Sequence, residues 1–429
     1  MFISPYIPTD HTAGTVDPLG IMRPFGLLAD QLFRQFTVLT WNPAYHGFLC
    51  FALKYAADHG RVTRRRPLGP TVREMEILWG LINRLAGSSI LNTTKFSALL
   101  DPSISPGITY QACLRRSSLF DRLGYGVLGH YTGPSRYWGL IDVRTGQLSK
   151  NGELLGLAWG QRCEHPFDEL LTAWLDGHTP AGLDEFTAHC QNYLGYALNA
   201  DPSNAERDVW VKVIRDYCAR WPQVTPLWAD PIAPELLHHR FKREEYHKFF
   251  DGLTAHYQNE PQLRRILEVC RLFEELAGLM QTVFDWQYVR RLDSQADSGE
   301  FKAGEKLLAD LSAEIVQDYE QAANQAKLNV TYGPAEKLRG VHNYRDIAET
   351  VYYHHQSHQR GKGGSPYFRE DQILIADRVD KENFLEHLRE LIQRPDRGRS
   401  LLASYQARDW HFSKALDWLK YAGVENVRS

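Results

Sequence analysis

The stretch QLRRILEVCRLFEELAGLMQTVFDWQ, residues 262–287, decides the fold class of this chain. Its apolar residues recur at intervals of three and four, which is the period of one face of an α-helix. A second stretch of the same kind, RDVWVKVIRDYC, occupies residues 207–218. Proline-rich loops near residues 222–234 separate the two, and we interpret nearly all of residues 167–322 as helical. We therefore predict a mainly α protein with a helical bundle over residues 161–330.

A segment before this bundle has a different character. Residues 135–141, SRYWGLI, precede a turn and then a second helix start, LSKNGEL, at residues 148–154. A helix, a hairpin and a further helix in this order resemble the closing half of a winged-helix unit, which we place at residues 106–160. Such a unit would bring Arg136 and Lys150 near a DNA duplex. Winged helices also serve as protein-interaction modules, so the alternative is that this unit binds another protein and not DNA.

The two ends of the chain complete four expected domains. Residues 1–105 form an N-terminal helical domain that contains an aromatic turn and an arginine run. Residues 331–429 form a C-terminal α+β segment, in which a His- and Gly-rich loop precedes a strand pair that turns at Glu370 and Asp371. The complete expectation is a helical bundle with a winged-helix-like unit and a small α+β C-terminal portion.

Composition places the chain among folded proteins without a membrane span. Its 429 residues suit two or three domains, and 43% hydrophobic with 24% charged residues is ordinary for a folded protein. No run of about 18 uncharged apolar residues occurs, and the N-terminus lacks the basic start and apolar core of a signal peptide. The six scattered cysteines form no CxxC pair and are expected to be reduced. We expect a cytoplasmic protein with no membrane partner.

Several familiar motifs of enzyme chemistry are missing from the sequence. It contains no Walker loop, no HExxH, no GxSxG and no protein-kinase signature. Nucleotide hydrolysis by a P-loop and zincin proteolysis are therefore excluded, and we expect no cofactor.

Charge is unevenly distributed although the net charge is only −3. Residues 61–73, RVTRRRPLGPTVR, carry five arginines and no acid, whereas residues 163–206 carry eight acids and no Lys or Arg. This asymmetry favours one basic and one acidic face, as expected where one side meets phosphates. Arg64, Arg65 and Arg66 are the predicted contacts, and a solvated basic loop is the alternative.

A run near the C-terminus, VYYHHQSHQRGKGGSPYF at residues 351–368, combines histidines, cations and glycines. Glycines let backbone N–H groups approach a phosphate closely, and a lysine among them suits a point-charge contact. His354 and His358 could instead share a helix face and bind a metal with Asp346 or Glu349. Hydrogen-bonded structural histidines are the third interpretation. The residues predicted to contact DNA in this run are His354, His355, His358, Arg360 and Lys362.

The aromatic turn of the N-terminal domain is WNPAYHGF, residues 41–48. An enzyme that flips a nucleotide needs aromatic rings to stack the base and a carboxylate or histidine to activate water. Trp41 and Tyr45 are the predicted stacking residues, because their side chains are aromatic. Asp17 and His46 are the predicted catalytic residues, because their side chains are a carboxylate and an imidazole. In the alternative interpretation these aromatic side chains belong to the core.

Several stretches of the chain resemble a group of bacterial proteins found in genome-defence neighbourhoods. They are DPLG at residues 17–20, LTWNPAYHGFLCFAL at residues 39–53, the later RYWGLID and LSKNGE, and HHQSHQRGKGGSPYF. That group has basic residues in the aromatic turn, where this chain has Asn42 and Pro43. The resemblance covers the N-terminal third and the C-terminal quarter of the chain.

This resemblance implies anti-phage defence by an action on foreign DNA, with phage DNA and other defence subunits as partners. Among enzymes, a DNA glycosylase that excises modified bases is favoured, because it needs neither a nucleotide cofactor nor an obligatory metal. The alternatives are a non-catalytic DNA-binding or adaptor subunit of a defence system and a metal-dependent nuclease.

Overall fold

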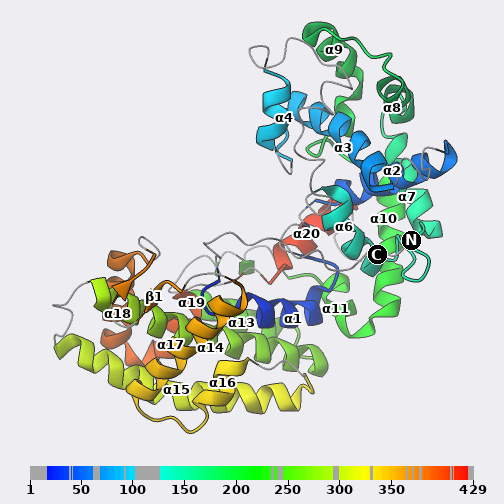
Figure 1. The fold of residues 1–429 in the computed structure, drawn as a ribbon. Helices are drawn as coiled ribbons and strands as arrows, with labels where there is room; N and C mark the ends of the chain where they lie inside the picture. The colour runs from blue at the N-terminus through cyan, green and yellow to red at the C-terminus, as the bar shows by residue number, and fades with distance from the viewer. Residues whose placement is uncertain are drawn as a thin grey trace. The chain divides into compact units, whose positions relative to one another are not determined.

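Helices make up most of the structure, which is a computed structural model of the chain (Figure 1). The mainly α class with a small C-terminal α+β portion, predicted from the sequence, is confirmed. None of the described helices is long and apolar enough to cross a membrane. The structure describes residues 17–37, 40, 42–60, 68–90, 93–101, 126–232, 236, 237, 239, 245–292, 299–328, 332–363, 366–369, 372–375, 379–405, 408 and 410–423.

The chain divides into two compact units, and each draws on separated parts of the sequence. The described residues of unit 1 come from Arg34–Pro231 and Lys414–Ser429, and those of unit 2 come from Pro8–Phe33 and Ile232–Ser413. The boundary after Pro231 falls inside the segment that we expected to be one helical bundle. Residues 126–160, the described part of the segment expected to form a winged-helix-like unit, lie within unit 1.

Unit 1 is built around α2 (Ala44–Asp58), which is buried along most of its length. Helix α7 (Lys150–Gly160) packs against α2, and a Cβ on its Gly156 would lie 2.8 Å from the backbone of Cys50. Glycine at this position therefore permits the close approach of the two helices. Unit 1 also contains α3 (Leu68–Leu85), α4 (Thr93–Leu99), α6 (Val127–Trp138), α8 (Phe167–Leu175), α9 (Leu183–Cys190), η3 (Gln191–Tyr196), α10 (Asn204–Arg220), η4 (Pro222–Val224), α11 (Thr225–Ala229) and most of α20 (Phe412–Tyr421).

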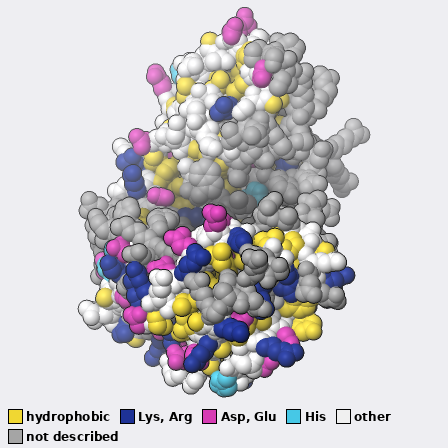
Figure 2. Space-filling model, turned by 90° about the vertical axis from the view of Figure 1, so that its left-hand side faces the viewer, with side chains coloured by type: hydrophobic (Ala, Val, Ile, Leu, Met, Phe, Trp, Pro, Cys, Tyr) yellow, Lys and Arg dark blue, Asp and Glu magenta, His cyan; other side chains and the backbone are white. Residues whose placement is uncertain are grey.

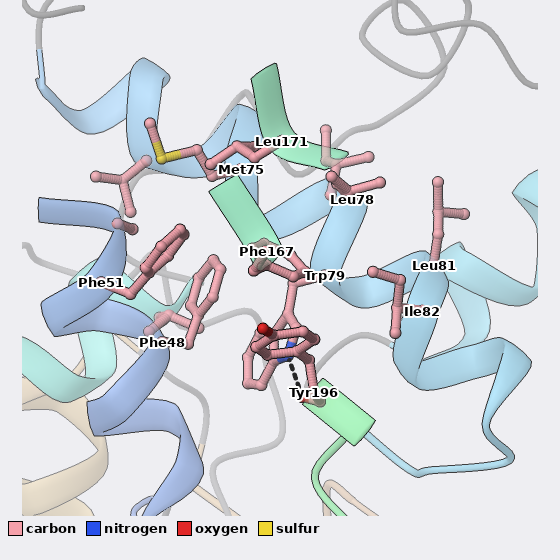
Figure 3. Close-up of a cluster of buried hydrophobic side chains, with 14 of the residues drawn as sticks. Phe48, Phe51, Met75, Leu78, Trp79, Leu81, Ile82, Phe167, Leu171 and Tyr196 are labelled. Atoms are coloured by element: carbon pink, nitrogen blue, oxygen red, sulfur yellow. Dashed lines mark hydrogen bonds between the residues drawn. The ribbon is translucent and has the colours of Figure 1, made fainter. Parts of the chain in front are cut away.

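The core of unit 1 is rich in aromatic side chains. Phe48 of α2 stacks on Trp79 of α3 with ring centroids 4.3 Å apart (Figure 3). Trp159 of α7 meets both rings edge-on. The indole Nε1 of Trp79 donates a hydrogen bond to the carbonyl oxygen of Tyr196, 2.8 Å away. Large aromatic side chains bury much apolar area each, so this cluster holds α2, α3 and α7 together.

Residues 126–160 form a helix, a short hairpin and a helix, and residues 106–125 of the expected winged-helix-like unit lie outside the described residues. Gly139 ends α6 in the left-handed region with φ 75°. One β-bridge then joins Ile141 to Leu148. The carboxylate of Asp142 accepts hydrogen bonds from the backbone N–H groups of Arg144 and Thr145, which closes the turn between the two paired segments.

Unit 2 is organised around α14 (Pro261–Leu292), a 32-residue helix that contains the stretch from which the fold class was predicted. A Cβ on Gly278 of α14 would lie 1.9 Å from the carbonyl oxygen of Leu402, so glycine permits the contact with α19 (Gly398–Tyr405). The other helices packed on α14 are α1 (Met22–Phe33), α13 (Tyr246–His256), α15 (Gly299–Gln325), α17 (Tyr344–Gly361) and α18 (Lys381–Gln393).

The small α+β portion of unit 2 follows α17. Strands β1 (Phe368–Arg369) and β2 (Gln372–Ile373) pair antiparallel, with Phe368 opposite Ile373. This confirms the strand pair that the sequence predicts, and the predicted turn residues Glu370 and Asp371 lie outside the described residues. The short helices α16 (Gly333–Leu338) and η7 (Pro395–Arg397) complete the description of unit 2.

Candidate nucleic-acid interface

His46, one of the two predicted catalytic residues, is fully buried in the core of unit 1. Its Nδ1 lies 2.7 Å from the Oγ of Ser135. Its ring meets the edges or faces of Tyr131, Trp210 and Trp418, with ring centroids 5.0 to 5.8 Å away. Burial lowers the pKa of His46 to about 3, so the ring is neutral at pH 7. In this position His46 acts as a packed core residue.

Asp17, the other predicted catalytic residue, lies in unit 2 at the start of α1. Its Oδ1 accepts from the backbone N–H of Ile21 at 2.8 Å, and its Oδ2 accepts from that of Met22 at 3.1 Å. A carboxylate in this position satisfies N–H groups that have no partner within the helix. Asp17 thus belongs to unit 2 and His46 to unit 1, and each side chain already has a structural role in its own unit.

The predicted stacking residue Tyr45 is also part of the unit 1 core. Its ring stacks on Tyr131 with centroids 4.6 Å apart and meets Trp79 edge-on at 5.2 Å. Its exposed fraction is 0%, as the core interpretation predicts. The other predicted stacking residue, Trp41, lies outside the described residues.

The remaining DNA contacts predicted for unit 1 are arginines and one lysine. Arg136 is half-buried in the last turn of α6, and Lys150 is exposed at the first position of α7. Arg64, Arg65 and Arg66 lie outside the described residues. On the face shown in Figure 2, Lys and Arg side chains lie among Asp and Glu side chains. Within the described residues, the candidates for an anion site are therefore local clusters of arginine and lysine.

The histidines of the His- and Gly-rich run contact the backbone of residues 17–20, here called the DPLG turn. His354 Nε2 lies 2.7 Å from the carbonyl oxygen of Leu19, and His355 Nδ1 lies 2.9 Å from that of Pro18. Burial lowers the pKa of both rings. His354 and His355, two of the three histidines predicted to contact DNA, thus each use one ring nitrogen in a hydrogen bond within the protein.

The rest of this run divides between the DPLG turn and solvent. The Lys362 ammonium lies 3.4 Å from the carbonyl oxygen of Asp17, and the His358 ring packs directly over Gly20. Arg360 is exposed on the last turn of α17 and stays accessible to a phosphate. Among the residues that the structure describes, no group of three or more His, Cys, Asp or Glu side chains could hold a metal ion.

The other side of α17 borders an open cavity of about 470 Å³ in unit 2, here called the Arg–Tyr groove. Most of the lining residues belong to α17. The last turns of α14 contribute three residues, and α15 contributes Glu305. The lining residues are Gln287, Arg290, Arg291, Glu305, Tyr344, Arg345, Ala348, Glu349, Tyr352 and Tyr353. Arginine and tyrosine side chains in one cavity are the types that contact phosphates and stack bases.

Arg291 holds a fixed position in this groove. Its guanidinium lies over the ring of Phe368, 4.3 Å from the centroid, and 5.9 Å from the centroid of Tyr352. Its Nη1 donates a hydrogen bond to the carbonyl oxygen of Gln287 at 2.6 Å. Cation–π contacts and this hydrogen bond orient a positive charge before any ligand arrives.

Two ion pairs lie at the rim of the groove. Arg290 is 3.3 Å from Glu305, and Arg345 is 3.4 Å from Glu349. The arginine side chains are 44% and 87% exposed. Solvent-exposed pairs of this kind contribute only about 0–1 kcal/mol, so a phosphate can compete for either guanidinium. With three arginines and two glutamates, the groove has an excess of positive charge.

The Tyr344 hydroxyl belongs to a groove residue that also packs against the core cluster of Trp286, Val289, Phe384 and Leu388. It is buried, and the described atoms give it no hydrogen-bond partner. Burial raises the pKa of this hydroxyl well above its ordinary value, with Glu305 adding to the effect, so the group stays protonated. Tyr353, in contrast, is 63% exposed. The groove therefore combines an accessible ring with a buried hydrogen-bond donor.

A second cavity in unit 2, of about 440 Å³, also contains arginines. There Arg271 and Arg399 both pair with Glu275, a carboxylate only 4% exposed, and Arg399 also pairs with Asp318 at 2.7 Å. Buried and shared carboxylates compete with a ligand more strongly than exposed pairs do. The Arg–Tyr groove is therefore the better anion site.

Sequence reasoning missed the Arg–Tyr groove although its parts follow helical spacing. Arg345, Glu349 and Tyr352 lie four and three residues apart and so share one face of α17. The signal on α14 is the adjacent pair of Arg290 and Arg291 in its last turn. Neither pattern indicates that the two helices bring these side chains together.

Comparison of the chain with protein-family models, with curated proteins and with solved structures found no match.

Proposed function

We propose that this protein is a DNA-binding subunit of a bacterial defence system and that the Arg–Tyr groove of unit 2 contacts the DNA. The groove is the observation that carries the proposal, because it gathers three guanidinium groups and three tyrosines in one open cavity. Arginine supplies the sequence-independent contacts to phosphate that dominate affinity for DNA. The defence context and foreign phage DNA as the target come from the resemblance in the sequence, and a cytoplasmic location is proposed from the composition and the N-terminal residues.

The binding-subunit proposal is favoured over the glycosylase because of where Asp17 and His46 lie. Asp17 caps α1 in unit 2, and His46 is enclosed by aromatic rings in unit 1. A general acid or base must reach a substrate atom at hydrogen-bond distance, and a fully buried His46 offers no such approach. Base excision remains the alternative activity, and the same experiment tests it.

The test is DNA binding as a function of salt for wild type and for the double variant Arg290→Ala, Arg345→Ala. Each lost phosphate contact should lower the slope of log K against log salt by about 0.9, so the double variant should lose about 2 units on duplex DNA. Arg339→Ala is the matched control, because Arg339 is 69% exposed in the same unit, pairs with Glu320 and does not line the groove. An unchanged slope in the double variant contradicts the proposal.

Hot alkali treatment of phage DNA after incubation with the wild-type protein completes this test. Intact strands together with DNA binding support a binding subunit. Strand breaks at abasic sites would instead establish base excision and overturn the non-catalytic part of the proposal.

A further inference from the structure

The Arg–Tyr groove has the size and the side chains for one nucleotide. We propose that it seats a single nucleotide unit with an unpaired base, which stacks on the tyrosine rings while its phosphate contacts the rim arginines. This inference rests on the proposed DNA binding and specifies the form of DNA that the groove takes. A cavity of about 470 Å³ lies in the range of small-ligand sites, roughly 300–1,000 Å³.

The proposed base is unpaired, because a tyrosine ring can stack only on a base whose face is accessible. The bases of a duplex are stacked on one another, so a protein ring reaches a base face only in a single strand or a flipped nucleotide. Tyr353 is 63% exposed at the groove wall, and Tyr352 meets it at 74° with ring centroids 5.3 Å apart. A planar base stacked on one ring would meet the edge of the other, and both are favourable aromatic arrangements.

The hydrogen-bonding groups of the groove match a base or sugar edge. The Tyr344 hydroxyl is buried and has no partner among the described atoms, and the Glu305 carboxylate, which pairs with Arg290, lines the same cavity and can accept a further hydrogen bond. A buried donor that lacks a partner is unfavourable, so a ligand atom that accepts from it gains the corresponding free energy. The residues of the groove thus include one hydrogen-bond donor, Tyr344, and one acceptor, Glu305.

The charges at the rim match the phosphate. Arg345 and Arg290 belong to exposed ion pairs with Glu349 and Glu305, and both guanidinium groups line the same cavity as the tyrosines. A guanidinium offers two parallel N–H groups to a phosphate, and exposed ion pairs with N···O distances of 3.3 and 3.4 Å compete with a phosphate only weakly. An aromatic ligand without a negative charge would gain nothing from the positive charge of these arginines.

The experiment measures binding of a labelled oligothymidylate, of a labelled duplex and of free thymidine monophosphate to the full chain. Tyr353→Ala should weaken oligothymidylate binding by about 5- to 150-fold, the equivalent of roughly 1–3 kcal/mol for one stacked base. Tyr353→Phe keeps the ring and should restore binding. Tyr344→Phe removes only the hydroxyl and should weaken binding of oligothymidylate and of thymidine monophosphate alike. Duplex affinity should change much less in all three variants.

The outcomes separate this inference from the proposed function. If Tyr353→Ala leaves oligothymidylate binding unchanged, or weakens duplex and oligothymidylate equally, the nucleotide site is overturned while DNA binding stands. If thymidine monophosphate binds the groove and neither DNA form does, the nucleotide chemistry is supported and the DNA-binding proposal fails. Failure of all three probes to bind overturns both.

Discussion

The two ring nitrogens of His355 have different and fixed roles at the residue scale. Nδ1 lies 2.9 Å from the carbonyl oxygen of Pro18 and must donate to it, whereas Nε2 accepts from the backbone N–H of Tyr367 at 2.9 Å. A proton on Nε2 would face that N–H group, so the folded protein needs the neutral ring. Burial lowers the pKa of His355 to about 4, and the charges of His358 and His354 add to the effect.

We expect His355 to make unit 2 less stable in acid. The folded-state pKa of about 4 is below the ordinary value of 6.5, so the stabilisation is present above pH 6.5 and is lost as the pH falls toward 4. The upper limit is about 1.4 kcal/mol per pH unit in that window. His355→Phe should lower the free energy of unfolding at neutral pH, because two hydrogen bonds are lost, and should reduce its dependence on pH. Urea unfolding at several pH values measures both effects.

A control for this prediction is His342→Phe, because His342 is exposed. It should leave the pH dependence of unfolding as in wild type. If the free energy of unfolding of His355→Phe depends on pH between 6.5 and 4 as that of the wild type does, protonation of His355 does not cause the loss of stability in acid.

Sequence alone identifies residue types at this scale but not their surroundings. Asp17, His46 and Tyr45 have the types that a base-flipping enzyme needs, and the same types cap a helix or fill a core. What decides between these roles is the set of contacts, and Ser135, which lies 2.7 Å from His46, is far from it in the sequence. The groove residue Tyr344 could not be found for the same reason.

At the scale of elements, α17 shows how a helix end depends on tertiary contacts. The sequence predicts a helix from residue 343 to 354 that frays before Gly361, whereas α17 continues to Gly361. Asn343 caps its start by accepting from the Asp346 N–H at 3.0 Å, which is a local signal. Its last turns are held by contacts to the DPLG turn, which no local pattern predicts. The strand pair after α17 was predictable, because its turn signal is local.

The contact between α17 and the DPLG turn requires Gly20, which gives an element-scale prediction. Gly20 has φ +66°, and a Cβ there would lie 2.6 Å from the His358 ring. Gly20→Ala should therefore lower the free energy of unfolding by backbone strain of about 1–2 kcal/mol and further by the collision with His358. Gly340→Ala is the matched control, with φ +71° and nothing within 4 Å. Equal losses in the two variants would show that the His358 contact does not matter.

Combining Gly20→Ala with His358→Ala separates these two causes. The double variant should recover the part of the loss that comes from the collision and keep the part that comes from the backbone. Chemical unfolding of the four proteins gives the interaction energy as a double-mutant cycle.

At the scale of the whole molecule, the two units could not be predicted from sequence order. Composition and turn signals suggest contiguous domains, but unit 1 takes α20 from the end of the chain and unit 2 takes α1 from its beginning. The amphipathic pattern of α1 and α20 predicts that each buries one face. It does not say which distant helices cover that face, because apolar surfaces are complementary in shape and not in sequence.

Two tryptophans only eight residues apart test this division, because the structure assigns them to different units. Trp418 packs in unit 1 on Phe36, 4.8 Å between centroids, and on Trp138, and Trp410 packs in unit 2 on Phe25, also at 4.8 Å. Both have an exposed fraction of 0%, so truncation to alanine should lower the free energy of unfolding by about 3–5 kcal/mol in each case.

Limited proteolysis with mass spectrometry should find the new cleavage sites of the Trp418→Ala variant within residues 126–231. Those of Trp410→Ala should fall within residues 245–292 and 299–405, because loss of packing raises the population of opened states in the unit that contained the side chain. If both variants are cut first in the same unit, the assignment of the two tryptophans to separate cooperative units is wrong.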